Sequence, residues 1–229
     1  MSDLNRELEA LLKECGADLV GFADLSDVPE AGLPFGVSVA IRLPPDIVRS
    51  IADGPNRAYY EAYHGINARL DRIVTAGAAF LLGLGYQAKA QTTKAVVKLD
   101  EYATQLPHKT VAIRAGLGWI GRSALLVTRE YGPALRFSSI LTDAPLETAK
   151  PVDVSSCGDC GECVRHCPAG ALKGEKWTSG LSRERLVDVN ACSQTAKRLC
   201  RERFGIEATI CGKCIEVCPF TRRYLKASE

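Results

Sequence analysis

The sequence predicts an α/β (α+β) fold: a first domain of alternating helices and strands, residues 1–148, followed by a cysteine-rich domain, residues 149–229. Three observations point to this organisation. Helical and strand-like patterns alternate through the first part of the chain, which is typical of α/β proteins. The composition then changes within DAPLETAKPVDVSS, residues 143–156, and nine of the ten cysteines lie beyond that segment.

The first domain is predicted from its hydrophobic periodicity. Apolar residues at helical spacing over residues 3–15 indicate an amphipathic helix that carries Cys15 on its core side. Further helices are predicted from about Pro44, over residues 57–84 and over residues 107–115. Short β-branched runs predict strands at residues 18–23, 36–43, 86–91, 96–99, 124–128 and 134–142.

A glycine-rich stretch follows the last predicted helix of this domain. Gly116, Gly118 and Gly121 match the dinucleotide fingerprint G-x-G-x-x-G. That motif binds pyrophosphate only after a strand and at the start of a helix, whereas here a helix precedes it and a strand follows. A nicotinamide site is therefore disfavoured. Two interpretations stay open: a turn that needs positive φ angles, or a close backbone approach to a flat cofactor beside Trp119.

The cysteine-rich domain opens with CGDCGECVRHCP, which runs from Cys157 to Pro168. Its spacing, C-x2-C-x2-C-x3-C-P, is the bacterial ferredoxin pattern for a 4Fe-4S cluster. Structural zinc usually takes two C-x2-C pairs with a longer spacer between them, and a disulfide framework belongs to short secreted chains. The spacing therefore favours iron–sulfur over both alternatives.

A second cysteine run, CGKCIEVCP, begins at Cys211 and is one cysteine short of the first. In two-cluster ferredoxins the last cysteine of each run binds the other cluster. The first cluster is then expected to take Cys157, Cys160, Cys163 and Cys218. The second takes Cys167, Cys211 and Cys214 and needs a fourth ligand. Cys192 and Cys200 both remain candidates, and the other is expected to be a small buried hydrophobe.

Composition and charge restrict the class of protein. The chain is 46% apolar, enough for a real core, and its net charge of +2 shows no basic excess that would indicate nucleic acid binding. The N-terminus lacks the features of a secretory leader, and the most apolar segment, residues 73–85, is too short to cross a bilayer. Cluster thiolates need a reducing compartment. We therefore expect a soluble cytoplasmic protein without membrane contact.

Two blocks of sequence resemble the epoxyqueuosine reductase family, to which reductive dehalogenases are related. They are RAGLGWIGRSALLVTREYG at Arg114–Gly132 and SSILTDAPL at Ser138–Leu146. GADLVGFA near the start and AYHGINARLDRI at Ala62–Ile73 are also similar to that family. The resemblance implies a nitroreductase-like cobalamin-binding domain followed by a bacterial ferredoxin-like domain with two 4Fe-4S clusters.

The resemblance also implies roles for particular residues. It assigns Cys192 as the missing ligand of the second cluster, which leaves Cys200 and Cys15 spare. It implies a base-off cobalamin against this stretch: Gly116, Leu117, Gly118, Trp119, Ile120, Gly121 and Arg122. Electrons would pass from the two clusters to the corrinoid, which would reduce a small substrate.

Two catalytic positions depart from the family pattern. An ungapped alignment places Tyr102 where the family has its proposed aspartate acid, and a shift of one residue brings Asp100 or Glu101 there instead. Tyrosine is the acid in the related reductive dehalogenases, so Tyr102 is the expected proton donor. The alternative is a partly buried aromatic with a satisfied hydroxyl. His108 stands where the family has glutamate.

The chain ends eleven residues after Cys218, without the helical repeats that follow in the tRNA-modifying members. The resemblance therefore implies a C-terminally truncated member that takes a small-molecule substrate rather than tRNA. An external electron donor such as ferredoxin or flavodoxin is expected. Two alternatives remain: an electron-transfer protein or corrinoid reductase that serves another enzyme, and a reductase whose nitroreductase-like domain holds a flavin.

Overall fold

The computed structural model describes residues 2–228, and contacts between Cα atoms group them into two units. The first unit contains the described residues up to Ile41, together with Gly65–Leu117 and Arg136–Val152. The second contains Arg42–His64, Gly118–Leu135 and the described residues from Asp153 onward. The second unit thus includes two segments from the first 148 residues. A single domain boundary between residues 148 and 149 stays a prediction.

A four-stranded sheet forms the centre of the first unit, with the strand order β1-β2-β6-β3. These strands are β1 Leu19–Asp24, β2 Phe35–Arg42, β6 Leu135–Thr142 and β3 Ala88–Ala90. β1 pairs antiparallel with β2, and β3 pairs antiparallel with β6. Antiparallel neighbours are not the parallel crossovers of a dinucleotide-binding sheet. The mixed α/β class is as predicted.

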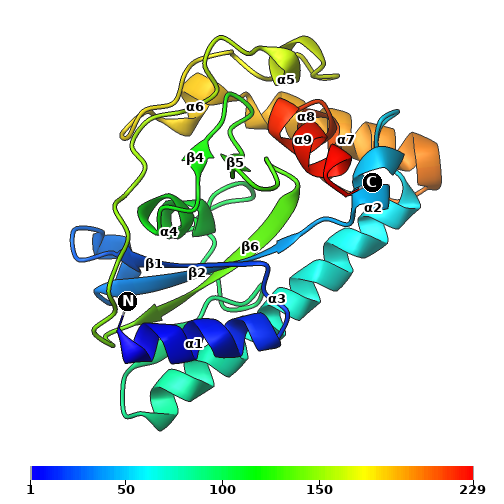
Figure 1. The fold of residues 1–229 in the computed structure, drawn as a ribbon. Helices are drawn as coiled ribbons and strands as arrows, with labels where there is room; N and C mark the ends of the chain where they lie inside the picture. Colours follow the sequence, from blue (N-terminus) through cyan, green and yellow to red (C-terminus); the bar gives the residue numbers. More distant parts are fainter. Residues whose placement is uncertain (1, 229) are drawn as a thin grey trace. The chain divides into compact units, whose positions relative to one another are not determined.

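Helices cover both faces of this sheet (Figure 1). They are α1 Asp3–Glu14, the part of α3 (Arg57–Gly83) from Gly65 onward, and α4 His108–Arg114. On one face α3 packs so closely that a Cβ atom at Gly77 would lie 2.6 Å from Ile140 and 2.8 Å from Leu12. On the other face, a Cβ at Gly21 would lie 2.9 Å from the carbonyl oxygen of Ala115, which ends α4.

Short helices and one hairpin build the second unit. The hairpin pairs β4, Trp119–Ile120, antiparallel with β5, Leu126–Val127. The helices include α2 Pro45–Ser50, α5 Glu162–Arg165, α6 Arg183–Leu186, α7 Val189–Phe204, α8 Lys213–Glu216 and α9 Pro219–Lys226. Among the helices of the described chain, none has the length and apolar character that crossing a membrane requires.

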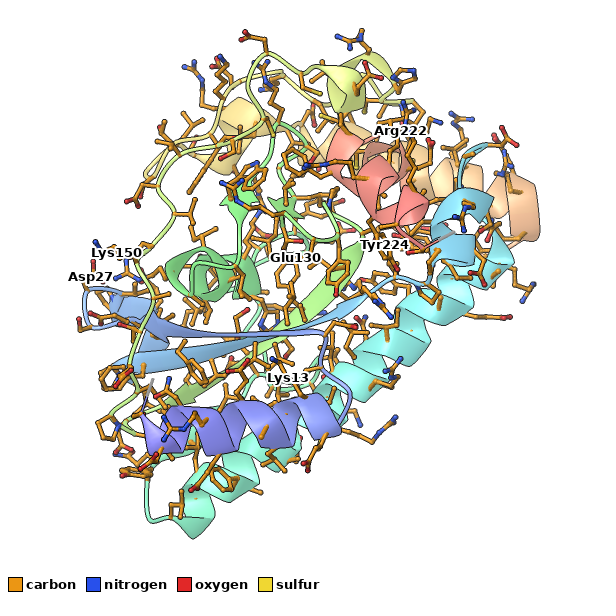
Figure 2. The ribbon with its side chains drawn as sticks, in the orientation of Figure 1. Lys13, Asp27, Glu130, Lys150, Arg222 and Tyr224 are labelled. Carbon is orange, nitrogen blue, oxygen red and sulfur yellow. The ribbon has the colours of Figure 1, made fainter. Side chains whose placement is uncertain are left out.

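The segment Arg42–His64 is held in the second unit by contacts with its C-terminal part. Tyr224 of α9, labelled in Figure 2, donates a hydrogen bond from its hydroxyl to the carbonyl oxygen of Leu43 at 2.9 Å. Its ring packs edge to face on Tyr131 with 5.1 Å between centroids. Because Tyr224 is buried, this hydrogen bond satisfies a hydroxyl that would otherwise be costly to bury.

Two sequence predictions about the first unit are wrong. Cys15 is exposed rather than facing the core, because α1 ends at Glu14 and Cys15 is its C-cap. Residues 96–99 do not form a strand and contain only an isolated bridge from Lys98 to Thr104. Val97 and Leu99 are 55% and 68% exposed, so this apolar run has no buried face to hold it in a sheet.

The hairpin explains why position 118 is glycine, and this gives a stability prediction. A Cβ atom at Gly118 would lie 2.1 Å from the carbonyl oxygen of Val127. We expect Gly118→Ala to lower the free energy of unfolding by about 2 kcal/mol or more, and the melting temperature by about 4–8 °C. Gly65→Ala is the control, since Gly65 lies in α3 with nothing within 4 Å of a Cβ. It should stabilise the protein by up to about 1 kcal/mol. Equal melting temperatures for the two variants, measured by circular dichroism, would contradict this assignment.

Candidate functional site: two groups of cysteine thiols

A first group of cysteines lines a small cavity in the second unit. We call Cys157, Cys160, Cys163 and Cys218 the first thiol group. They line a cavity of about 110 Å³, which Cys214 also lines. A tight turn, in which the Cys160 amide donates to the Cys157 carbonyl at 3.2 Å, brings the first two together. Cys163 lies on α5, and Cys218 is the N-cap of α9.

A second group lines a neighbouring cavity of about 100 Å³. We call Cys167, Cys192, Cys211 and Cys214 the second thiol group. Cys192 lies in the N-terminal part of α7 and Cys214 lies on α8. Cys214 lines both cavities, as does Ser123, so the two cavities share a wall.

Cys200 does not line either cavity. It is fully buried, and its thiol donates to the carbonyl oxygen of Ile210 at 3.1 Å. It lies eight residues beyond Cys192 on α7, which is about 12 Å along a helix axis. One helix therefore presents Cys192 to the second cavity and carries Cys200 away from it. Sequence spacing alone does not decide between Cys192 and Cys200 as the fourth member of the second thiol group.

Burial and neighbouring thiols raise the pKa of cysteines in both groups. Burial, and then the charges of Cys157, Cys218 and Cys160, raise the pKa of Cys163 to about 11. Burial, followed by the charges of Cys211 and Cys192, raises the pKa of Cys214 as well. Like-charged thiolates in a buried site repel one another, so either group needs a strongly positive partner before its members ionise together.

The geometry does not suit a single metal ion. Within residues 2–228, no three His, Cys, Asp or Glu side chains converge as they would around one ion. Zinc would require ligands that meet about 2.0–2.3 Å from a common point. A 4Fe-4S cubane instead offers a separate iron to each of four cysteines. Two groups of four thiols around separate cavities supply the number of ligands that two cubanes need.

The hairpin that starts at Gly118 forms a wall of the first cavity. The indole nitrogen of Trp119 donates a hydrogen bond to the sulfur of Cys157 at 3.3 Å. Arg122 lines the same cavity, and its guanidinium donates to the carbonyl oxygens of Gly158 and Gly174 at 2.9 and 2.6 Å. The Nε of Arg122 is buried without a hydrogen-bond partner within the protein. A cation and an N–H donor beside the thiols suit an anionic cluster, and Glu162 lines the same cavity as a further charged group.

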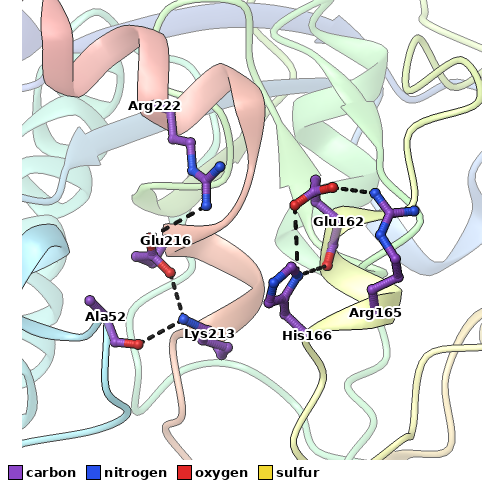
Figure 3. Close-up of polar contacts among 7 residues, drawn as sticks. All are labelled: Ala52, Glu162, Arg165, His166, Lys213, Glu216 and Arg222. Carbon is purple, nitrogen blue, oxygen red and sulfur yellow. Dashed lines mark hydrogen bonds and ion pairs between the residues drawn. The ribbon is translucent and has the colours of Figure 1, made fainter.

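Ion pairs lie within both cysteine runs (Figure 3). The Lys213 ammonium donates to the carbonyl oxygen of Ala52 at 2.7 Å and to the Glu216 carboxylate at 2.8 Å. In the first run, the hydrogen bond from Arg165 holds the pKa of Glu162 below its ordinary value. His166 donates from Nδ1 to the carbonyl oxygen of Glu162 at 2.9 Å, so this ring is engaged with its own helix.

The stretch predicted to lie against cobalamin is explained by contacts inside each unit. A Cβ at Gly116 would lie 3.1 Å from Ala149, and Leu117 packs on the apolar core beside α4. Residues 118–121 are buried, and a Cβ at Gly121 would lie 2.7 Å from Val127. The glycines therefore make room for the protein's own atoms. The role of residues 116–122 in cofactor binding stays a proposal.

The predicted proton donor belongs to the first unit. Tyr102 is partly exposed, and its backbone N–H donates to the Asp100 carboxylate at 2.6 Å. His108, at the start of α4, makes a 2.8 Å hydrogen bond through Nδ1 with the Ser139 hydroxyl. Burial, and then the charge of Arg136, lower the pKa of His108 to about 4, so this imidazole is neutral at pH 7. A role for Tyr102 in proton transfer stays a proposal.

Two residues at the first cavity have roles that sequence reasoning missed. The sequence resemblance predicts that Trp119 and Arg122 contact a corrinoid. In the structure, both side chains lie beside the first thiol group. Their position in the glycine-rich block gives no sign of this, because Cys157 follows Trp119 by 38 residues and only the folded chain brings them together.

Comparison with known sequences identifies the cysteine-rich part. Residues 156–221 match the 4Fe-4S double cluster binding domain. An epoxyqueuosine reductase from Listeria monocytogenes is 35% identical over 121 residues, which cover 52% of this chain and 30% of that protein. Tetrachloroethene reductive dehalogenase from Sulfurospirillum multivorans is 32% identical over 115 residues, 48% of this chain and 23% of that protein. The match thus spans less than a third of these curated relatives.

Solved structures extend the likeness to the fold. A catabolic reductive dehalogenase has a TM-score of 0.72 at 21% identity, over 96% of this chain and 33% of that one. An epoxyqueuosine reductase solved with a modified tRNA stem loop has a TM-score of 0.61 at 20% identity, over 96% of this chain and 65% of that one. The chain is therefore similar in sequence to epoxyqueuosine reductases and a reductive dehalogenase over about half of its length, shares the α/β fold of their solved structures, and matches a 4Fe-4S double cluster binding domain at residues 156–221.

Proposed function

We propose that this protein is an iron–sulfur, cobalamin-dependent reductase of a small-molecule substrate, with one 4Fe-4S cluster bound by each thiol group. The observation that carries the proposal is the pair of cavities, one lined by the first thiol group and the other by the second, each of which combines cysteines from both motifs. The match of residues 156–221 to a double cluster domain supports the same assignment. Cys218 in the first group and Cys167 in the second follow the crossed ligation of two-cluster ferredoxins.

The shared wall of the cavities supports a relay of electrons. Cys214 and Ser123 line both cavities, so clusters held there are neighbours. The hydrogen bond from Trp119 and the charge of Arg122 lie at the first cavity, whereas Lys213, which is paired with Glu216, lines the second. Hydrogen bonds to sulfur and nearby charge set cluster potentials, so the two clusters are expected to differ in potential. With different potentials, electron transfer between the two clusters favours the cluster with the higher potential.

The corrinoid part of the proposal rests on the relatives, one of which is described in terms of B12-dependent dehalogenation. A bound corrinoid would supply the reductive chemistry, while the chain would supply electrons, position and a proton. Tyr102 is the proposed proton donor. An external donor such as ferredoxin or flavodoxin is the proposed source of electrons. The formal net charge of +2 gives no support to a nucleic acid substrate.

Substitution of one cysteine on α7 tests the ligand set. Cys192→Ser removes a member of the second thiol group, so we expect the iron content of anaerobically reconstituted protein to fall from about eight to about four per chain. Cys200→Ser is the matched control on the same helix, and it should retain about eight irons because Cys200 lines neither cavity. Loss of iron from Cys200→Ser together with a full content in Cys192→Ser would reverse the assignment.

Removal of the indole N–H tests the assignment of the first cavity. We expect Trp119→Phe to lower the midpoint potential of the cluster in the first thiol group by about 20–40 mV, because the hydrogen bond stabilises the more negative reduced state. The measurement is a redox titration followed by electron paramagnetic resonance. Trp177→Phe is the control, since Trp177 is also buried, at 6% exposed against 2% for Trp119. An unchanged potential in Trp119→Phe would mean that the indole does not act on a cluster.

The reductase proposal is tested by adding cob(II)alamin to cluster-loaded protein under anaerobic conditions. We expect cobalamin to co-elute with the protein on a sizing column. With a halogenated aromatic acid as the probe substrate, Tyr102→Phe should retain cobalamin and iron but lose about a hundredfold in turnover. Tyr86→Phe, in the same unit, is the control. Cobalamin that elutes separately from fully loaded protein would refute the proposal and favour an electron-transfer protein.

A further inference from the structure

A third cavity in the second unit contains none of the cluster cysteines. Its volume is about 480 Å³, which is within the range of small-molecule sites. The lining residues come from the start of α3, from α7 and from the segment that leads into the second cysteine run: Tyr60, Tyr63, His64, Lys197, Glu207, Ala208, Thr209 and Ile210. Neither the proposed cluster sites nor the proposed proton donor Tyr102 belongs to this cavity.

Aromatic rings form one wall of the cavity. Tyr60 and His64 lie one helical turn apart on α3, and their rings meet edge to face with 4.4 Å between centroids. The ring of Tyr63 lies 5.3 Å from that of His64, also edge to face. The ring centroid of Phe204, at the end of α7, lies 6.1 Å from that of Tyr60. Rings that are partly exposed and held by one another offer a surface on which a planar aromatic ligand stacks.

The opposite wall carries a small excess of positive charge. The Lys197 ammonium lies 3.9 Å from the Glu207 carboxylate, and Arg201 forms a second ion pair with the same carboxylate. Two cations therefore share one anion, which leaves a formal charge of +1 in this group. An anionic substituent of a ligand would be attracted to these two cations.

Chain connectivity places this cavity beside the second thiol group. Ile210 lines the cavity, and the next residue, Cys211, belongs to the second thiol group. On α7, Lys197 lines the cavity while its neighbour Ala196 lines the cavity of the thiols. Consecutive Cα atoms are about 3.8 Å apart, so at two points the walls of the two cavities are one residue apart.

We propose that this third cavity binds a planar aromatic anion of the flavin mononucleotide class and is where electrons enter the second cluster. The isoalloxazine ring would stack on the tyrosines and the phosphate would pair with Lys197. In each transfer one electron leaves the reduced flavin and enters the cluster, and the proton released from the flavin goes to solvent. The proposal that electrons enter the second cluster here rests on the proposed function, whereas the proposal that the cavity binds FMN does not.

Equilibrium dialysis of cluster-loaded protein against FMN and against riboflavin tests the proposal. We expect saturable binding of both, tighter for FMN. Tyr63→Leu should weaken both by about tenfold, the loss of one stacking partner. Lys197→Met should weaken FMN by about fivefold and leave riboflavin unchanged, because only FMN carries the phosphate. Tyr86→Leu and Lys89→Met, in the first unit, are the controls and should bind as the unaltered protein does.

Two results would overturn the proposal. One is the absence of saturable FMN binding, and the other is FMN binding that neither Tyr63→Leu nor Lys197→Met weakens. Iron is counted on every sample, so that loss of a cluster is separated from loss of the flavin site. Protein with about eight irons but no FMN binding would refute the third cavity as a flavin site and leave the proposed reductase standing.

Discussion

The two groups of cavity-lining thiols are the physical constraint on which the second unit depends. Eight cysteines line two cavities that share a wall, and the pKa of Cys163 is already raised to about 11 by burial and neighbouring thiols. As thiolates they would repel one another, so they require the positive charge of iron to ionise together. Since metal binding then contributes directly to folding free energy, cluster assembly and folding of this unit are expected to be coupled.

The remaining parts of the second unit shield and tune these cavities. The hairpin from Gly118 places an indole N–H on Cys157 and a guanidinium at the first cavity. Tyr224 ties Arg42–His64 to α9, which begins directly after Cys218. Burial and hydrogen bonding to sulfur both act on cluster potential. The same contacts that stabilise the unit therefore also set how readily its clusters accept electrons.

Prediction from sequence succeeded where the determining contacts are local. Three of the four thiols in the first group are fixed by spacing within one loop, whereas Cys192 and Cys200 could be separated only by the direction in which α7 presents them. The α/β class followed from hydrophobic periodicity. The β-branched residues at 96–99 predict a strand, but Val97 is exposed and the segment has no buried face to hold it in a sheet. The partnership of Trp119 with Cys157 had no sequence signal, because it depends on packing between distant segments.

The proposed function requires that one chain holds two neighbouring 4Fe-4S clusters. The most direct test is electron paramagnetic resonance of dithionite-reduced, reconstituted protein, with iron and sulfide counted on the same sample. Two cubanes across a shared wall predict about eight irons, about two unpaired spins per chain, and a spectrum broadened by interaction between those spins. About four irons with a single undisturbed spin signal, or zinc in place of iron, would contradict the claim.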